Sequence, residues 1–289
     1  MPMTANLRRS ALFMPASNPR AIAKARTLPC DAVILDLEDA VAPDEKARAR
    51  EAAVAAAREG FGARMLVLRV NGLATSWGAD DLAAARDAPF DAVLAPKVDT
   101  PEDVRGYAER LGARQELWIM VETCAGVLGV EALAASGRPL TTIVLGFNDL
   151  AKEMRAKPGP DRAPFLPFLG RAVAAARIHG LHVLDAVYNR IDNAEGFARS
   201  CAQSVEFGCD GRSLIHPSQI GACNAAFSPS ADEVAGARAI IDAFGRPENR
   251  DKGAVKVGGA MAERLHLLEA ERLLAFATAC AERGGGSNL

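Results

Sequence analysis

Two carboxylates in the middle of the chain, Glu122 and Asp149, each follow a short apolar run, residues 118–121 and 142–145. A short apolar run bounded by glycine and small polar residues is typical of a strand buried on both faces. Residues 126–136 between the runs have helical spacing, so the stretch predicts a β-α-β unit. Neighbouring parallel strands lie about 5 Å apart. The two acids could therefore approach one point although they are distant in the sequence.

Such a pair of carboxylates suits a magnesium ion. Mg²⁺ typically takes one or two protein carboxylates and leaves its other positions to water and substrate. The alternative is that each acid only caps the helix that follows it. The presence of an acid after both of two neighbouring strands favours the metal.

The composition limits the classes of protein to which the chain can belong. It has 289 residues, 49% of them hydrophobic, a net charge of −2 and a pI near 6.1. These values favour one main domain with a large core, and they give no basic field for nucleic acid or an anionic membrane. No apolar stretch approaches the roughly 18 residues that span a bilayer, so we expect a soluble, cytoplasmic protein.

A repeated pattern of apolar run, polar loop and Ala-rich amphipathic helix must position the two acids. It predicts eight strands, at residues 10–14, 31–36, 64–70, 91–97, 118–121, 142–145, 180–187 and 208–215. Eight strands alternating with helices predict an α/β fold, a (β/α)8 TIM barrel, rather than an open doubly wound sheet. We place the barrel domain in residues 1–228 and a C-terminal helical extension in residues 229–289. Within the extension we expect an extended piece at 254–257 and a helix from about 261 to 282.

Active sites of this fold lie at the C-terminal ends of the strands. The predicted strand ends carry charged side chains, namely Asp36, Glu38, Asp39, Arg69, Lys97, Glu122 and Asp149. Arg69 follows an apolar run, and its planar guanidinium suits a carboxylate or an enolate-like oxygen. The alternative for Arg69 is a structural salt bridge to the acids at 36–39. Lys97 is a candidate Schiff-base lysine, but a bound metal would make that chemistry redundant, so we favour an electrostatic or structural role.

Seven segments of the chain, found in order from about residue 7 to 221, resemble the citrate lyase β-subunit-like (CitE-like) branch of the HpcH/HpaI aldolase superfamily. The matching segments are LRRSALFMPASNPRAIAKA, DAVILDLEDAVAPDEKARAR, VLRVNGLATSWGADDL, DAVLAPKV, VETCAGV, GFNDLA and DAVYNRIDNAEGFARSCAQSVEFGCDGRSLIHPSQI. The resemblance implies a TIM barrel and a Mg²⁺-dependent carbon–carbon lyase. The reaction it implies cleaves or forms a small hydroxyacyl thioester of the malyl-CoA, citramalyl-CoA or citryl type. The partners would be a small oxo acid and an acyl-CoA, with no nucleic acid and no membrane.

The resemblance also implies roles for single residues. Glu122 and Asp149 would hold the metal, Glu122 would also contact the substrate, and Arg69 would bind the oxo-acid carboxylate as a catalytic residue. The acids that would orient the metal's water ligands are Asp36, Glu38 and Asp39. Two other activities stay open, a hydroxyacyl-CoA thioesterase and an aldolase that acts on a small hydroxy-oxo acid without coenzyme A.

The extension departs from the pattern of its relatives. In the family it lies over a neighbouring subunit's barrel and carries a motif like VDGxM[IV]D, to which residues 257–263 correspond. Gly258 replaces the first Asp and Glu263 the second, and the resemblance makes Glu263 the catalytic acid or base. The alternative is that Glu263 is a solvated helix residue. The resemblance further implies a homo-oligomer, a trimer or hexamer, whereas the apolar residues of the last helix equally suit packing on the chain's own barrel.

Overall fold

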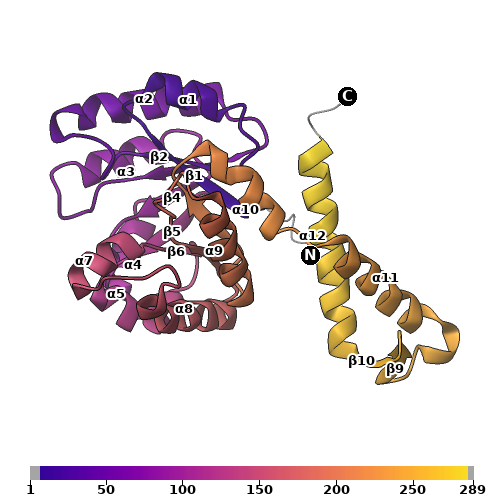
Figure 1. The fold of residues 1–289 in the computed structure, drawn as a ribbon. Coiled ribbons are helices and arrows are strands. Elements are labelled where there is room, and N and C mark those ends of the chain that lie inside the picture. The colour runs from indigo at the N-terminus through magenta and orange to yellow at the C-terminus, as the bar shows by residue number, and fades with distance from the viewer. Residues whose placement is uncertain (1–6, 286–289) are drawn as a thin grey trace. The chain divides into compact units, whose positions relative to one another are not determined.

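Eight parallel strands close into a barrel in the computed structural model, which describes residues 7–285 (Figure 1). Each strand pairs with the next along the chain, and β8 pairs with β1 to complete the closure. The strands are β1 (Ser10–Pro15), β2 (Ala32–Asp36), β3 (Met65–Arg69), β4 (Ala92–Ala95), β5 (Glu116–Val121), β6 (Leu140–Leu145), β7 (His182–Asp185) and β8 (Gly211–Leu214). The predicted (β/α)8 barrel is confirmed.

Helices follow the strands and surround them (Figure 1). They are α1 (Pro19–Ala25), α2 (Lys46–Glu59), α3 (Gly78–Arg86), α4 (Pro101–Ala108), α5 (Cys124–Leu128), α6 (Val130–Ala134), α7 (Phe147–Met154), α8 (Leu166–His179), α9 (Ala194–Glu206) and α10 (Ile220–Ala226). Short 3₁₀ turns precede α2 (Pro43–Glu45), α8 (Ala163–Phe165) and α10 (Pro217–Gln219). The single helix expected at 126–136 is wrong, because two short helices meet there at Gly129, which is the C-cap of one and the N-cap of the other.

The side chains of each strand alternate between two apolar clusters, as the pleat requires. One cluster lies between the strands and the helices. The other fills the barrel interior and contains Ala11, Ala32, Ile34, Met65, Val67, Ala92, Leu94, Trp118, Met120, Val144 and Leu184. Knowing one interior residue of a strand therefore fixes the direction of every other side chain on that strand.

The chain divides into two compact units, one of which is the barrel, Arg8–Phe227. The second contains the chain from Ser228 onward, with α11 (Ala231–Gly245), a 3₁₀ turn (Pro247–Asn249), β9 (Ala254–Val257), β10 (Ala260–Glu263) and α12 (Arg264–Gly285). Among the described residues, none of the helices combines the length and the apolar character needed to cross a bilayer.

The second unit contains a hairpin that the sequence did not predict. The extended piece at 254–257 is β9, but the residues expected to begin a helix near 261 form β10, which pairs antiparallel with β9. Val257 pairs with Ala260, so the loop is two residues long. Gly258 and Gly259 both have positive φ, 57° and 90°, as the tight turn of a two-residue hairpin requires. The helix start was wrong because the glycine pair is a hairpin loop rather than a linker before a helix.

Candidate active site

Three charged residues extend the interior-facing rows of their strands to the C-terminal rim. Asp36 comes two residues after Ile34, Arg69 two after Val67, and Glu122 two after Met120, and these three apolar residues all lie in the barrel interior. A period of two keeps side chains on one face of a strand. The barrel therefore directs all three charges to its open end, where Asp36 and Arg69 are also register partners across β2 and β3.

A glycine makes room for Glu122 on the neighbouring strand. Gly146 comes two residues after the interior residue Val144, and a Cβ atom at this position would lie 2.4 Å from Glu122 Cβ and 2.6 Å from Glu122 Oε2. Any side chain at 146 would therefore displace the Glu122 carboxylate. The glycine in the sequence GFND is explained by this close approach rather than by a turn.

Asp149 reaches the rim from a helix. It is the third residue of α7, whose N-cap is Gly146, and the N-cap of α5 is Thr123, whose hydroxyl accepts a hydrogen bond from the Gly126 N–H. Neither Glu122 nor Asp149 is thus the cap of the helix that follows it. The side chain of Asp149 is 36% exposed, whereas Glu122 is 2% exposed. Asp149 faces the opening and Glu122 lies deeper.

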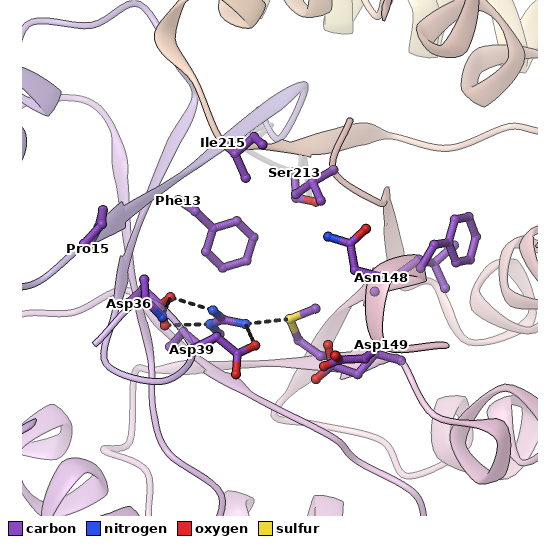
Figure 2. Close-up of a pocket in the computed structure, with 16 residues that line it drawn as sticks. Phe13, Pro15, Asp36, Asp39, Asn148, Asp149, Ser213 and Ile215 are labelled. Carbon is purple, nitrogen blue, oxygen red and sulfur yellow. Dashed lines mark hydrogen bonds and ion pairs between the residues drawn. The ribbon is translucent and has the colours of Figure 1, made fainter. Parts of the chain in front are cut away.

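A cavity of about 370 Å³ brings these residues together. Asp36, Arg69, Glu122 and Asp149 all line it, and Figure 2 shows Asp36 and Asp39 across the cavity from Asn148 and Asp149. Apolar side chains complete the wall, namely Phe13, Pro15, Met120, Leu145, Phe147, Val187 and Ile215. The cavity thus has a charged wall and an apolar wall, an arrangement suited to a small acid with a short carbon chain.

The guanidinium of Arg69 is bound mainly by Asp36. Its Nε and Nη2 donate to the two Asp36 carboxylate oxygens at 2.7 and 2.5 Å, and Nη1 lies 3.0 Å from Glu38 Oε2 and 3.6 Å from Asp39 Oδ2. Burial opposes the charge, but the bonds to Asp36 and the nearby acids hold the pKa of Arg69 above its usual range. The salt bridge weighed as the alternative role is present. Because Asp36 occupies Nε and Nη2, Nη1 is left for the other neighbours, and it donates to Sδ of Met120, which lines the cavity, at 3.9 Å.

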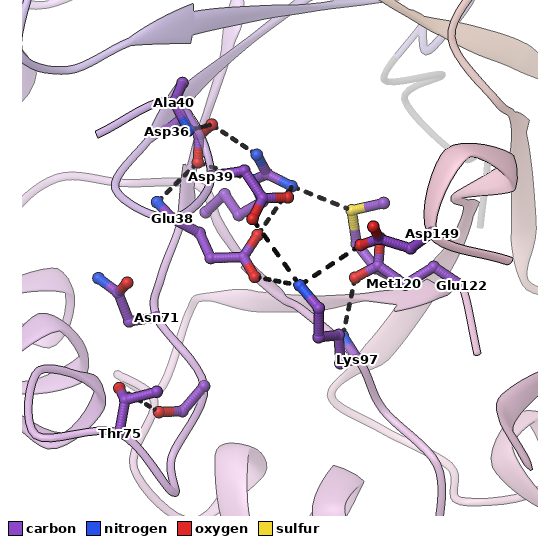
Figure 3. A network of polar contacts seen from close by, with 12 residues as sticks. Asp36, Glu38, Asp39, Ala40, Asn71, Thr75, Lys97, Met120, Glu122 and Asp149 are labelled. Atoms are coloured by element: carbon purple, nitrogen blue, oxygen red, sulfur yellow. Dashed lines mark hydrogen bonds and ion pairs between the residues drawn. The ribbon is translucent and has the colours of Figure 1, made fainter. Parts of the chain in front are cut away.

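Lys97 joins the two sides of the acidic cluster (Figure 3). Its Nζ lies 2.5 Å from Glu38 Oε1, 3.4 Å from Asp149 Oδ2 and 3.9 Å from Asp39 Oδ1. Its backbone N–H donates to Glu122 Oε1 at 3.0 Å. One residue therefore contacts both carboxylates that the sequence singled out as metal ligands.

The electrostatics of the cluster show a shortage of positive charge. Burial, with Glu38 and Asp149 nearby, raises the pKa of Glu122 to about 7 in spite of the opposing effects of Lys97 and Arg69. Burial likewise raises the pKa of Glu38, although Arg69 and Lys97 oppose the shift. Glu38 Oε2 is buried and accepts no hydrogen bond. A cation placed near these oxygens would relieve both effects.

The types of side chain at the barrel rim fit a magnesium ion. Glu122 and Asp149 present hard oxygen donors to one cavity, and a cation bound there would offset the raised pKa of Glu122. Within residues 7–285 there is no cluster of three or more His, Cys, Asp or Glu side chains arranged to hold a metal. A metal bound by two carboxylates would keep most of its coordination positions for water and substrate.

The residues predicted from the sequence therefore divide into two sets. Those that line the cavity or contact the lining residues are Asp36, Glu38, Asp39, Arg69, Glu122 and Asp149. Glu263 lies in the second unit, where it is the exposed last residue of β10 rather than a helix residue, and its N–H donates to His266 Nδ1 at 2.9 Å. The sequence did not indicate Asn148, which lines the cavity and exchanges side-chain hydrogen bonds with Asn189 at 2.7 and 3.3 Å. Its position next to Asp149 in the sequence could have indicated that it lies at the site.

Known proteins are similar to this chain over nearly its whole length. A sequence model of the HpcH/HpaI aldolase/citrate lyase family matches residues 9–217. The (3S)-malyl-CoA thioesterase of Cereibacter sphaeroides is 43% identical over 274 residues, which cover 94% of this chain and 95% of that protein. The citrate lyase β subunit of Escherichia coli K12 is 31% identical over 267 residues, covering 89% of this chain and 88% of that subunit.

A solved structure has the same fold over both units. The protein CitE of Mycobacterium tuberculosis, in complex with magnesium, acetoacetate and coenzyme A, matches with a TM-score of 0.77 and 30% identity. The match covers 93% of this chain and 97% of that chain.

Proposed function

This chain belongs to the HpcH/HpaI aldolase/citrate lyase family, and we propose that it hydrolyses a small hydroxyacyl-CoA thioester of the malyl-CoA type with the help of Mg²⁺. The observation that carries the proposal is that Arg69, Glu122 and Asp149 line one cavity together at the barrel rim. The choice of hydrolysis is supported by the 43% identity to a malyl-CoA thioesterase, since this likeness extends through the second unit.

In this proposal Glu122 and Asp149 hold the metal, which when bound would polarise a carbonyl oxygen as a Lewis acid. Arg69 donates from Nη1 to a carboxylate of the substrate, while Asp36 fixes the orientation of the guanidinium. The apolar wall packs against the carbon chain and excludes water from it. Glu38 and Asp39 balance Arg69 and Lys97. Glu263, on the second unit of a neighbouring copy of the chain, supplies or accepts the proton.

Carbon–carbon cleavage, the reaction expected first from the sequence, is the second candidate. It is supported by the likeness to citrate lyase β subunits and by the same charged wall, because an oxo acid and a thioester enolate also need cationic stabilisation. An aldolase that does not use coenzyme A is the third candidate, and nothing in the cavity favours it.

The two leading reactions give different products from one substrate. With (3S)-malyl-CoA and Mg²⁺, hydrolysis releases a free thiol and malate, whereas cleavage releases glyoxylate and acetyl-CoA without a free thiol. We expect thiol release to dominate and to be lost in Glu122→Gln. Glyoxylate formation without thiol would make the chain a lyase, and activity on a free hydroxy-oxo acid alone would make it an aldolase.

We also propose that residues 229–289 join copies of this chain into a trimer or hexamer. The support is that Met261, Leu265 and Leu268 are 65%, 50% and 67% exposed. Exposed apolar side chains that lie close together along the chain are a candidate interaction surface. Truncation before Ala231 should leave the barrel folded, by circular dichroism, and lower the oligomeric mass in light scattering. An unchanged mass would show that the extension does not assemble the protein.

A further inference from the structure

Lys97 has an unusual backbone conformation. It follows β4 and Pro96, and its φ is 49°, in the left-handed region that few non-glycine residues adopt. In this conformation its N–H donates to Glu122 while its side chain reaches Glu38 and Asp149. A sparsely populated backbone conformation at a charged rim persists only where surrounding contacts hold it.

The charges around Lys97 are unequal. Five carboxylates face one another here, Asp36, Glu38, Asp39, Glu122 and Asp149. Three cations lie near them, Arg69, Lys97 and, on the side of Asp36, Glu38 and Asp39, Lys46. Arg69 gives its fork to Asp36. The ammonium of Lys97 is therefore the main counter-charge on the side of Asp149.

We propose that Lys97 is an internal counter-ion of the metal site, whose ammonium holds Asp149 in the metal-free protein and must release it when Mg²⁺ binds. The inference rests on the proposed function, because it takes Glu122 and Asp149 as the ligands. Lys97 then has two opposite effects. Its ammonium competes with the metal for Asp149, while its N–H fixes Glu122 whether or not the metal is present.

The same contacts argue against a Schiff-base role for Lys97. A lysine that attacks a carbonyl must be a free amine. Burial disfavours the ammonium, but the hydrogen bond to Glu38 and the surrounding carboxylates raise the pKa of Lys97 above its ordinary value. The electrostatic role favoured from the sequence therefore agrees with the contacts.

The test is the affinity of the full-length protein for Mg²⁺, titrated as MgCl₂ in a calorimeter without substrate. Lys97→Met removes the ammonium and keeps the backbone N–H, so Kd should fall roughly tenfold, as expected for removing one like charge a few ångströms from the ion. The unfolding temperature without Mg²⁺ should fall, and its rise on adding Mg²⁺ should exceed that of the wild type. Lys97→Arg keeps the charge and should stay near the wild-type Kd.

Two further variants keep the test decisive. Lys152→Met removes the same charge from an exposed position on α7, the helix of Asp149, and should leave Kd within twofold. Lys97→Gln keeps a donor for Glu38 without charge and replaces Lys97→Met if that variant does not fold. An unchanged or higher Kd in the neutral Lys97 variants would overturn the counter-ion role alone. If the wild type does not bind Mg²⁺, or if Glu122→Gln and Asp149→Asn bind it as well as the wild type does, the proposed function fails with it.

Discussion

Two strands end in an aspartate, and the two aspartates lie in opposite environments. Asp36 comes two residues after the interior residue Ile34, so it faces the cavity, whereas Asp185 directly follows the interior residue Leu184, so it faces the helices. The exposures of both are near zero, 2% and 0%. Burial alone therefore does not distinguish them, and the difference of one residue in register does.

The clusters around the two aspartates differ in the sign of their excess charge. Asp185 is one acid beside two arginines, with Arg162 Nη1 at 2.7 Å and Arg212 Nη1 at 3.4 Å, and Ser204 donates to it at 2.5 Å. Burial opposes its ionisation, but Arg212 and Arg162 hold the pKa of Asp185 below its usual range. The cluster of Asp36 has an excess of acids and opens into a cavity. A closed cluster with excess base stabilises the fold, whereas an open cluster with excess acid is suited to receiving a cation.

The largest effect is expected for Asp185→Asn. Loss of this charge leaves the buried guanidinium of Arg212 and the partly buried one of Arg162 without their anion, which should cost about 3–5 kcal/mol of unfolding free energy. Mg²⁺ affinity should change little. Urea unfolding and Mg²⁺ calorimetry measure the two quantities, and a stable Asp185→Asn that lost Mg²⁺ binding would reverse the roles assigned to the clusters.

The pH dependence of stability follows from the same residue. Because the folded-state pKa of Asp185 is lowered, its contribution is full above the ordinary aspartate pKa and is lost as pH falls through the lowered one. Asp185→Asn should therefore flatten the loss of stability below about pH 4.

An aspartate-to-asparagine change in the open cluster around Asp36 should lower activity without lowering stability. Asp149→Asn should reduce Mg²⁺-dependent turnover on the order of a thousandfold, since a ligand of the catalytic ion is lost. It removes an acid from a cluster with excess acid, so the unfolding temperature should stay constant or rise. Turnover within tenfold of the wild type, measured at saturating Mg²⁺, would contradict the assignment of Asp149 as a ligand.

Glu263→Gln tests whether the second unit takes part in the chemistry. If Glu263 is the acid or base, turnover should fall by about a hundredfold. Calorimetry should give unchanged affinities for Mg²⁺ and oxo acid, because the proposed ligands lie in the barrel. Activity within a few-fold of the wild type would assign proton transfer to another group.

Arg69→Lys should have the smallest effect of the four substitutions. A lysine keeps the charge but cannot reproduce the two contacts with Asp36 or hold Nη1 toward the cavity. Affinity for an oxo acid such as pyruvate, measured with Mg²⁺ present, should fall roughly tenfold. Equal affinity in both proteins would leave Arg69 as a structural partner of Asp36 alone.

Much of the fold and part of the site could be predicted from the sequence. The apolar runs gave all eight strands to within a few residues, because strands buried on both faces leave a continuous signal. The alternation of side chains within those runs also places Asp36 and Asp185 on opposite faces of the barrel sheet, although this was not predicted from the sequence. The contact of Lys97 with Asp149 depends on a left-handed backbone and joins the loop after β4 to the first turn of α7, which is distant in sequence. No local pattern encodes such a contact.

The glycine turn of the second unit has an evolutionary consequence. The motif that residues 257–263 resemble has an aspartate at the position of Gly258, whose φ of 57° belongs to the first residue of a two-residue hairpin loop. Aspartate is among the residues that tolerate this conformation, at a cost of about 1 kcal/mol relative to glycine. A single substitution can therefore add or remove a carboxylate here without refolding the hairpin.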